Sequence, residues 1–269
     1  MAQKVVLITG GSSGIGKAIG MYLKSKDFKV YGTTRTLTKY ADFNHFNLLV
    51  LDVHDATSIE EAVAKLVALE GKIDVLINNA GVGITGPIEE TPNDEIEKAF
   101  NTNLFGPIRV IKAILPQMRE QRSGLIINIT SIAGYMGLPY RGIYSATKGA
   151  LELVTEAFRM ELKDFGILMT NVAPGDFATN IASGRYHAPI LEDSPYKKPY
   201  GDTLDAINTD VDSGGDPIAV AHLIYKIIQT KKPKIHYKVG DFMQKFSLIL
   251  KNVLPDKVYE KLLLNHYKL

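Results

Sequence analysis

Apolar runs of strand length alternate with longer segments of helical period along almost the whole chain. The expected strands cover residues 5–9, 29–34, 46–53, 73–78, 125–131, 167–173 and 234–238. The expected helices between them cover residues 14–26, 56–70, 93–120, 144–165 and 217–230. Several strands are apolar on both faces, which is typical of a parallel sheet covered by helices on each side. The pattern predicts a single α/β domain with a Rossmann-type, doubly wound sheet of seven parallel strands.

Two segments depart from this alternation. Residues 181–216 are rich in proline, glycine, tyrosine and acidic residues, so we expect a long loop that acts as a substrate lid. A disordered surface insertion is the alternative. Residues 241–269 mix apolar and lysine side chains and predict a C-terminal helical extension of the domain formed by residues 1–240. We expect this extension to cover the cleft or to contact another subunit, with contact to a membrane surface as the alternative.

The composition excludes several classes of function. The chain has no cysteine, so disulfides, thiolate metal sites and cysteine nucleophiles are excluded, and we predict no metal site. A formal net charge of +2 is too small for a nucleic-acid-binding surface. A run of about 20 apolar residues, as a transmembrane helix needs, is missing. Because a predicted strand begins at residue 5, we expect no signal peptide and a cytoplasmic protein.

A glycine-rich turn, TGGSSGIG at residues 9–16, lies between the first predicted strand and the first predicted helix. Glycines let the backbone turn tightly and approach a ligand. The start of a helix offers free N–H groups and a positive dipole end to a phosphate. The spacing is a variant of the dinucleotide-binding fingerprint. It predicts cofactor contacts from Gly10, Ser12, Ser13, Gly14, Ile15 and Gly16.

The end of the second predicted strand indicates which dinucleotide binds. An NAD site usually has an acidic residue here that binds the ribose 2′-hydroxyl, but this chain has Thr34 and Arg35. A guanidinium can pair with a 2′-phosphate through its planar fork, and the threonine hydroxyl can assist. We therefore predict NADP(H) as the preferred cofactor and NAD(H) as the alternative. A solvated surface arginine would be the ordinary interpretation of Arg35.

Three side chains predict proton-transfer chemistry. Tyr144 and Lys148 are four residues apart at the start of a predicted helix, so they share a face. A neighbouring ammonium favours the phenolate form of a tyrosine. Ser131, at the end of a predicted strand, can hydrogen-bond a carbonyl or alkoxide oxygen, although serines at strand ends often only cap or turn the chain. Together with a dinucleotide site, the three residues favour an enzyme.

Six motifs, in order along residues 5–239, resemble those of the short-chain dehydrogenase/reductase family. They are the glycine-rich turn, Asp52-Val53, NNAG at residues 78–81, NTNLFG at residues 101–106, Ser131 with Tyr144 and Lys148, and PGDFAT at residues 174–179. Twelve residues separate the serine from the tyrosine, the common interval in the family. Residues 30–35 and the long C-terminus are similar to the branch that contains 17β-hydroxysteroid, retinol and acyl-dihydroxyacetone-phosphate reductases.

The resemblance implies a role for each motif residue. Tyr144 would donate the proton in reduction and accept it in oxidation. Lys148 would favour the phenolate and hold the nicotinamide ribose, and Ser131 would orient the substrate carbonyl. Asn103 would kink its helix and position a water that links the lysine to solvent. Further cofactor contacts are implied for Asp52, Val53, Asn79, Ala80, Gly81, Tyr144, Lys148, Pro174, Gly175, Phe177 and Thr179.

Simpler roles are the alternatives for some of these residues. Asp52 would then only cap the following helix, and Asn78 and Asn79 would only stabilise the sheet. The expected substrate walls, at residues 82–84, 136–140 and 181–200, are mostly apolar or aromatic.

We therefore predict an NADPH-dependent oxidoreductase that interconverts a lipophilic ketone or aldehyde and an alcohol by hydride transfer. The alternatives are a 3-oxoacyl-thioester reductase and, from another class, a catalytically idle dinucleotide-binding regulator. The resemblance also implies a homodimer or homotetramer.

Overall fold

The computed structural model describes residues 3–177, 184–212 and 214–269. Among these residues, seven parallel strands form one sheet in the order β3-β2-β1-β4-β6-β7-β9. Their bounds are β1 (Val5–Ile8), β2 (Lys29–Thr34), β3 (Asn47–Val50), β4 (Val75–Asn78), β6 (Gly124–Ile129), β7 (Ile167–Pro174) and β9 (His236–Val239). The order runs outward from β1 in both directions, which confirms the predicted doubly wound fold.

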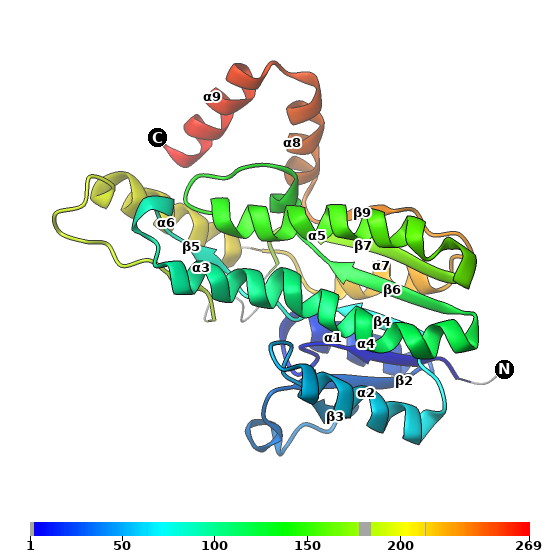
Figure 1. Ribbon diagram of the computed structural model, residues 1–269. Coiled ribbons are helices and arrows are strands. Elements are labelled where there is room, and N and C mark those ends of the chain that lie inside the picture. The colour runs from blue at the N-terminus through cyan, green and yellow to red at the C-terminus, as the bar shows by residue number, and fades with distance from the viewer. Residues whose placement is uncertain (1–2, 178–183, 213) are drawn as a thin grey trace.

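Helices cover both faces of this sheet (Figure 1). Helices α1 (Gly14–Ser25) and α7 (Ile218–Ile228) pack on one face, and α2 (Ala56–Glu70), α4 (Gly106–Gln121) and α5 (Gly142–Glu161) lie on the other. Successive side chains of a strand point to opposite faces, so Val5 and Leu7 join one apolar core while Val6 and Ile8 join the other. Burial on both faces explains why this strand is apolar throughout.

The helix expected over residues 93–120 is not continuous, so this prediction is wrong in detail. It consists of α3 (Asn93–Phe100), a π-helical turn η3 (Asn101–Phe105) and α4. A π turn adds one residue to a helical turn and is often found at functional sites. Here the side chain of Asn103 leaves the helix and hydrogen-bonds the backbone of Val82 instead.

The long loop expected over residues 181–216 is also wrong. Its described part contains the strand β8 (Tyr186–His187), which pairs with β5 (Ile84–Thr85), and the helix α6 (Lys197–Asp212). Tyr200 anchors this helix, because its ring is only 1% exposed and its hydroxyl donates to the carbonyl oxygens of Thr85 and Ala188 at 3.2 and 3.0 Å. The remainder of the segment, residues 181–183 and 213, lies outside the described residues.

The C-terminal extension consists of two helices, α8 (Phe242–Val253) and α9 (Asp256–Tyr267). Figure 1 shows them at the top of the view, above α5, with α9 extending toward the side where α6 lies. Leu248 and Tyr259 pack with Ile132 and Met136, next to the end of β6. Within the described residues, the structure contains no helix with both the length and the apolar character needed to cross a membrane.

His187 in β8 predicts a pH dependence of stability. Its Nδ1 atom is buried and has no hydrogen-bond partner among the described residues. Burial and then the nearby charge of Arg185 lower the pKa of the imidazole from its ordinary value of 6.5. As the pH falls below that value, the unfolded chain binds a proton that the folded chain does not, so the free energy of unfolding decreases. We expect the free energy of unfolding of His187→Gln to decrease less at acidic pH, because the variant lacks this histidine.

The measurement is urea unfolding of wild type and variant at neutral and mildly acidic pH. His222→Gln, which replaces an exposed histidine of α7, is the control and should retain the wild-type decrease. An equal decrease in wild type and His187→Gln would contradict the prediction.

Candidate active site

Helix α5 carries both the tyrosine and the lysine of the predicted proton-transfer pair. Tyr144 and Lys148 line a cavity of about 70 Å³ at the carboxyl ends of β4, β6 and β7, called the smaller cavity below. The Nζ atom of Lys148 lies 5.9 Å from the centre of the Tyr144 ring and donates to the carbonyl oxygen of Ile129 at 3.0 Å. Burial lowers the pKa of the Lys148 ammonium, while the Tyr144 and Glu152 charges act in the opposite direction.

Ser131 comes to the same cavity from the end of β6. Its backbone is extended, and it begins the short 3₁₀ helix η4 (Ile132–Tyr135). The hydroxyl oxygen accepts from the N–H of Ala133 at 3.2 Å and lies 3.5 Å from the carbonyl oxygen of Pro174. Because β6 and β7 are neighbours in the sheet, the serine and the proline lie side by side in the wall of the cavity.

Asn103 does not line the cavity but lies directly behind it, fully buried in the π turn. Its Oδ1 accepts from the N–H of Val82, and its Nδ2 donates to the Val82 carbonyl oxygen, both at 2.9 Å. Nδ2 also lies 3.1 Å from the hydroxyl of Thr147. A Cβ on Gly81 would lie 3.2 Å from Oδ1 of Asn103 and 3.3 Å from Nζ of Lys148. The asparagine and the lysine therefore converge on this glycine.

A larger cavity of about 380 Å³ adjoins the first, and Ile15, Asn79, Gly81 and Val82 line both. Most of the predicted cofactor residues line this larger cavity: Gly10, Ser12, Ser13, Gly14, Ile15, Thr34, Arg35, Asp52, Val53, Asn79, Ala80 and Gly81. Pro174, Gly175 and Phe177 line the smaller cavity with the tyrosine and the lysine. Gly16 lines neither cavity, and it packs closely against Gly10 of the glycine-rich turn. Thr179 lies outside the described residues.

The glycine-rich turn fits a dinucleotide. Gly10 and Gly14 have φ angles of 64° and 52°, in the left-handed region that glycine adopts readily. The side chain of Ser13 does not cap α1, and the first turn of this helix has no acidic residue. The N–H groups and the positive dipole end of α1 therefore remain available to a pyrophosphate.

The structure decides one of the simpler alternatives, the role of Asp52 as a helix cap. Asp55, not Asp52, caps α2 by accepting from the N–H of Thr57 at 2.9 Å. Asp52 accepts from the N–H of His54 and lines the larger cavity, so the helix-capping alternative is wrong.

The side chain of Asn79 donates to the carbonyl oxygens of Thr9 and Gly10 at 3.0 and 3.1 Å. It stabilises the turn and lines both cavities. Asn78 donates to Asn128 at 2.9 Å and links two buried strands.

Four charged residues at the two cavities were not predicted individually. Arg141, Asp176 and Arg185 line the smaller cavity, and Lys39 lines the larger one near Arg35. The walls of the smaller cavity therefore combine apolar residues with two guanidinium groups. The sequence contains signals for two of these residues, because Asp176 lies in the PGDFAT motif and Arg141 precedes Tyr144 by three positions. Arg185 lies within the expected substrate wall at residues 181–200, although the residue itself was not singled out, and Lys39 comes from a segment without a recognisable pattern.

Gly16→Ala should weaken binding of NADPH and of NADH. A Cβ at this position would lie 2.4 Å from the carbonyl oxygen of Gly10 and 2.5 Å from Nδ2 of Asn79, so the turn would have to move. Overpacking of this kind typically costs 1–3 kcal/mol, and we expect affinity to fall about tenfold or more in a titration of NADPH fluorescence. Gly201→Ala is the control, because its Cβ would meet only Ile190, at 3.7 Å, among the described residues. Unchanged affinity in Gly16→Ala would contradict the assignment.

Comparison with known proteins agrees with this geometry. The family model for short chain dehydrogenase matches residues 4–189. The chain is 38% identical over 261 residues to a 3-ketodihydrosphingosine reductase of Bacteroides thetaiotaomicron, covering 97% of this chain and 96% of that protein. It is 31% identical over 255 residues to 17-beta-hydroxysteroid dehydrogenase type 1 of Mus musculus, covering 88% of this chain and 74% of that protein.

Among solved structures, ElxO with NADP bound has a TM-score of 0.74 and 30% identity, covering 88% of this chain and 97% of that one. The matching family model, the full-length relative and the shared sheet lead to one conclusion. The chain belongs to the short-chain dehydrogenase/reductase family, whose members use NAD(P)(H) to interconvert carbonyl and alcohol groups.

Proposed function

We propose that this protein is an NADPH-dependent reductase that converts a lipophilic ketone or aldehyde into an alcohol. The proposal rests on one observation. Ser131, Tyr144 and Lys148 all line the smaller cavity, which adjoins the larger cavity. Such an arrangement provides a proton donor, a charge that stabilises its conjugate base and a hydrogen bond for the substrate oxygen. The same residues serve the reverse reaction with the proton moving in the other direction.

Each side chain has a distinct task in this mechanism. The bound cofactor supplies a hydride for the carbonyl carbon. Tyr144 donates its phenolic proton to the carbonyl oxygen as negative charge develops there. Ser131 hydrogen-bonds the same oxygen and stabilises that charge. The ammonium of Lys148 stabilises the phenolate that remains, because opposite charges at short distance favour the ionised form.

The surroundings support a lipophilic substrate. Val82, Ile84 and Phe177 line the smaller cavity, and apolar walls suit an alkyl or ring system next to the reacting carbonyl. Two of the similar proteins, the 3-ketodihydrosphingosine reductase and the 17-beta-hydroxysteroid dehydrogenase, are named for a sphingoid ketone and a steroid.

The preference for NADPH rests on the rim of the larger cavity. Arg35 and Lys39 lie there with the hydroxyl groups of Thr34 and Thr36. Asp52 is the one acidic residue among the described residues that line this cavity, and it comes from the end of β3 rather than β2. Two cations and two hydroxyls suit a 2′-phosphate, which carries a charge of about −1.5 to −2 at neutral pH.

Tyr144→Phe tests the mechanism. The variant lacks the transferable proton but keeps the ring, so we expect kcat to fall at least about 100-fold, within the range for loss of general acid catalysis. Affinity for NADPH should change little. Oxidation of NADPH with a panel of alkyl and cyclic ketones gives the rates, and Tyr225→Phe on α7 is the matched control. Retention of full activity would refute the role of Tyr144, and the absence of any turnover by wild type would refute the reductase.

Arg35→Met tests the cofactor preference. Loss of a charge-assisted hydrogen bond of about 1.5–3 kcal/mol should lower kcat/KM for NADPH roughly 10- to 100-fold. The value for NADH should change by less than about threefold, because NADH lacks the phosphate. Arg119→Met, which removes an exposed arginine of α4, controls for the change in net charge. Equal losses with the two cofactors would remove the basis for the preference.

A further inference from the structure

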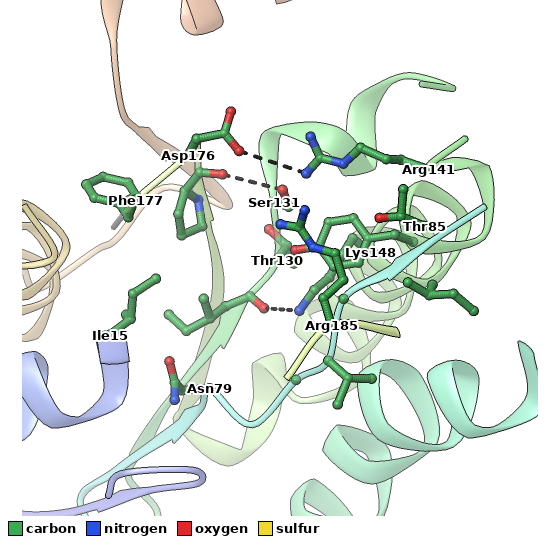
Figure 2. Close-up of a pocket in the computed structure, with 18 residues that line it drawn as sticks. Ile15, Asn79, Thr85, Thr130, Ser131, Arg141, Lys148, Asp176, Phe177 and Arg185 are labelled. Atoms are coloured by element: carbon green, nitrogen blue, oxygen red, sulfur yellow. Dashed lines mark hydrogen bonds and ion pairs between the residues drawn. The ribbon is translucent and has the colours of Figure 1, made fainter. Parts of the chain in front are cut away.

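Two arginines occupy the substrate end of the site, and the mechanism above uses neither. Arg141 directly precedes α5, and Arg185 directly precedes β8. Both line the smaller cavity with Tyr144, and the Arg141 guanidinium lies 5.7 Å from the centre of the tyrosine ring. Figure 2 shows both guanidinium groups on the side of the cavity that Lys148 occupies, across from Phe177.

The positive charges of these arginines are poorly matched by the protein. Nη1 of Arg185 is buried without a hydrogen-bond partner among the described residues. Arg141 is 13% exposed, and its Nη2 atom lies 3.9 Å from Oδ1 of Asp176, which is longer than a hydrogen bond. The other oxygen of this carboxylate accepts from Gln244 at 2.8 Å. Buried donors are normally satisfied, so this pair of guanidinium groups has capacity for a further acceptor.

The charges in the smaller cavity also favour binding of an acceptor, and specifically of an anion. Among the described residues that line it, Arg141, Lys148 and Arg185 are cations and Asp176 is the one carboxylate. Burial and then the Arg141 charge lower the pKa of Arg185, while the Tyr144 and Asp176 charges act in the opposite direction. Two guanidinium groups that line one partly desolvated cavity repel each other. An oxyanion placed between them would relieve this repulsion.

The backbone holds Arg185 in position. The N–H of Tyr186 donates to the carbonyl oxygen of Gly83 at 3.0 Å, and the N–H of Ala188 donates to that of Thr85 at 2.8 Å. The arginine side chain lies flat on Gly83, where a Cβ would be only 2.8 Å from its Cγ. Pairing of β5 with β8 thus directs the side chain into the substrate end of the site.

The cofactor phosphates have a separate place. Ser12, Ser13 and Gly14, at the start of α1, line the larger cavity, whereas Arg141 and Arg185 line only the smaller one. The arginines therefore face the part of the site that receives the substrate.

We propose that the substrate carries an anionic head group near its carbonyl, a carboxylate, sulfonate or phosphate, and that Arg141 and Arg185 bind it. This inference rests on the proposed reductase function and narrows its substrate class to amphiphilic oxo acids. A planar guanidinium binds such oxyanions through two parallel N–H groups. The apolar part of the substrate would then contact Val82, Ile84 and Phe177.

A binding experiment tests the anion site without any turnover. Decanoate and its methyl ester are titrated by calorimetry into the NADPH-loaded wild type and into Arg185→Met, Arg185→Lys and Arg119→Met. We expect wild type to bind the acid about tenfold or more tightly than the ester, in keeping with charged hydrogen bonds. Arg185→Met should abolish this preference, Arg185→Lys should retain part of it, and the surface variant Arg119→Met should retain all of it. Equal affinity of wild type for acid and ester would overturn the proposal.

Three further titrations sharpen the result. Decane sulfonate and decyl phosphate in place of decanoate identify which oxyanion binds best. Decylammonium tests the opposite charge, and tighter binding of this cation than of decanoate would overturn the proposal. A loss of NADPH affinity in Arg185→Met that accounts for the lost acid binding would also overturn it, because the arginine would then serve the cofactor.

Measurements of turnover distinguish failure of the head-group inference from failure of the proposed reductase function. The substrates are 4-oxododecanoate and its methyl ester, with NADPH. We expect kcat/KM for the acid to exceed that for the ester about tenfold or more in wild type, and the ratio to approach one in Arg185→Met. Equal turnover of acid and ester would overturn the head-group inference and leave the reductase standing. Selective binding of decanoate without reduction of any ketone would support the anion site and refute the reductase.

Discussion

The buried positive charge of Lys148 is the interaction around which the site is arranged. Moving an ammonium out of water costs several kcal/mol even after the protein relaxes, and this side chain is only 5% exposed. The Ile129 carbonyl oxygen accepts one of its hydrogen bonds, and the Glu152 charge, one turn further along α5, favours the ammonium form. A phenolate on Tyr144 is a second counter-charge. The pairing of tyrosine and lysine on one helical turn therefore serves the stability of the lysine and the chemistry of the tyrosine together.

Glu152, which lies one turn after Lys148, holds α5 against the sheet through buried hydrogen bonds. The buried carboxylate is satisfied by donors from four separate segments, and a buried charge is tolerated only when such partners are present. The donors are Thr130 after β6, Tyr135 in η4 at 2.8 Å, Asn171 in β7 at 2.7 Å and His236 in β9 at 2.7 Å. Because these groups hold α5 against the sheet, they also determine where the ring of Tyr144 points. The orientation of the proton donor thus depends on a polar network of which only Thr130 lines the smaller cavity among the described residues.

Local patterns were sufficient to predict the sheet and the phosphate-binding turn, whereas features made by distant contacts were not predictable. The bounds of β2 and α2 match the expected residues because strand and helix periods are local properties. The π turn at Asn103 is different, since its partner Val82 is 21 residues away. Helical period did not predict this turn, and only the family resemblance implied a kink at Asn103. Likewise, α6 replaces an expected loop because Tyr200 is buried against residues from two other segments. Arg185 reaches the site only because β5 pairs with β8. Each of these strands has two residues, which is too short to be recognised in a sequence.

The distribution of charge in the two cavities differs from that of the whole chain. Five cations and two carboxylates line them among the described residues, although the formal net charge of the chain is only +2. A cleft lined by one sign of charge concentrates ligands of the other sign, so both cavities attract anions. The long-range field does not distinguish a cofactor from a substrate, and selection between them must depend on short-range contacts. Arg35 is exposed to screening by salt, whereas Nη1 of Arg185 is buried and screened far less. The exposed end therefore suits a charged phosphate that stays hydrated, and the buried end suits an oxyanion that gives up its water.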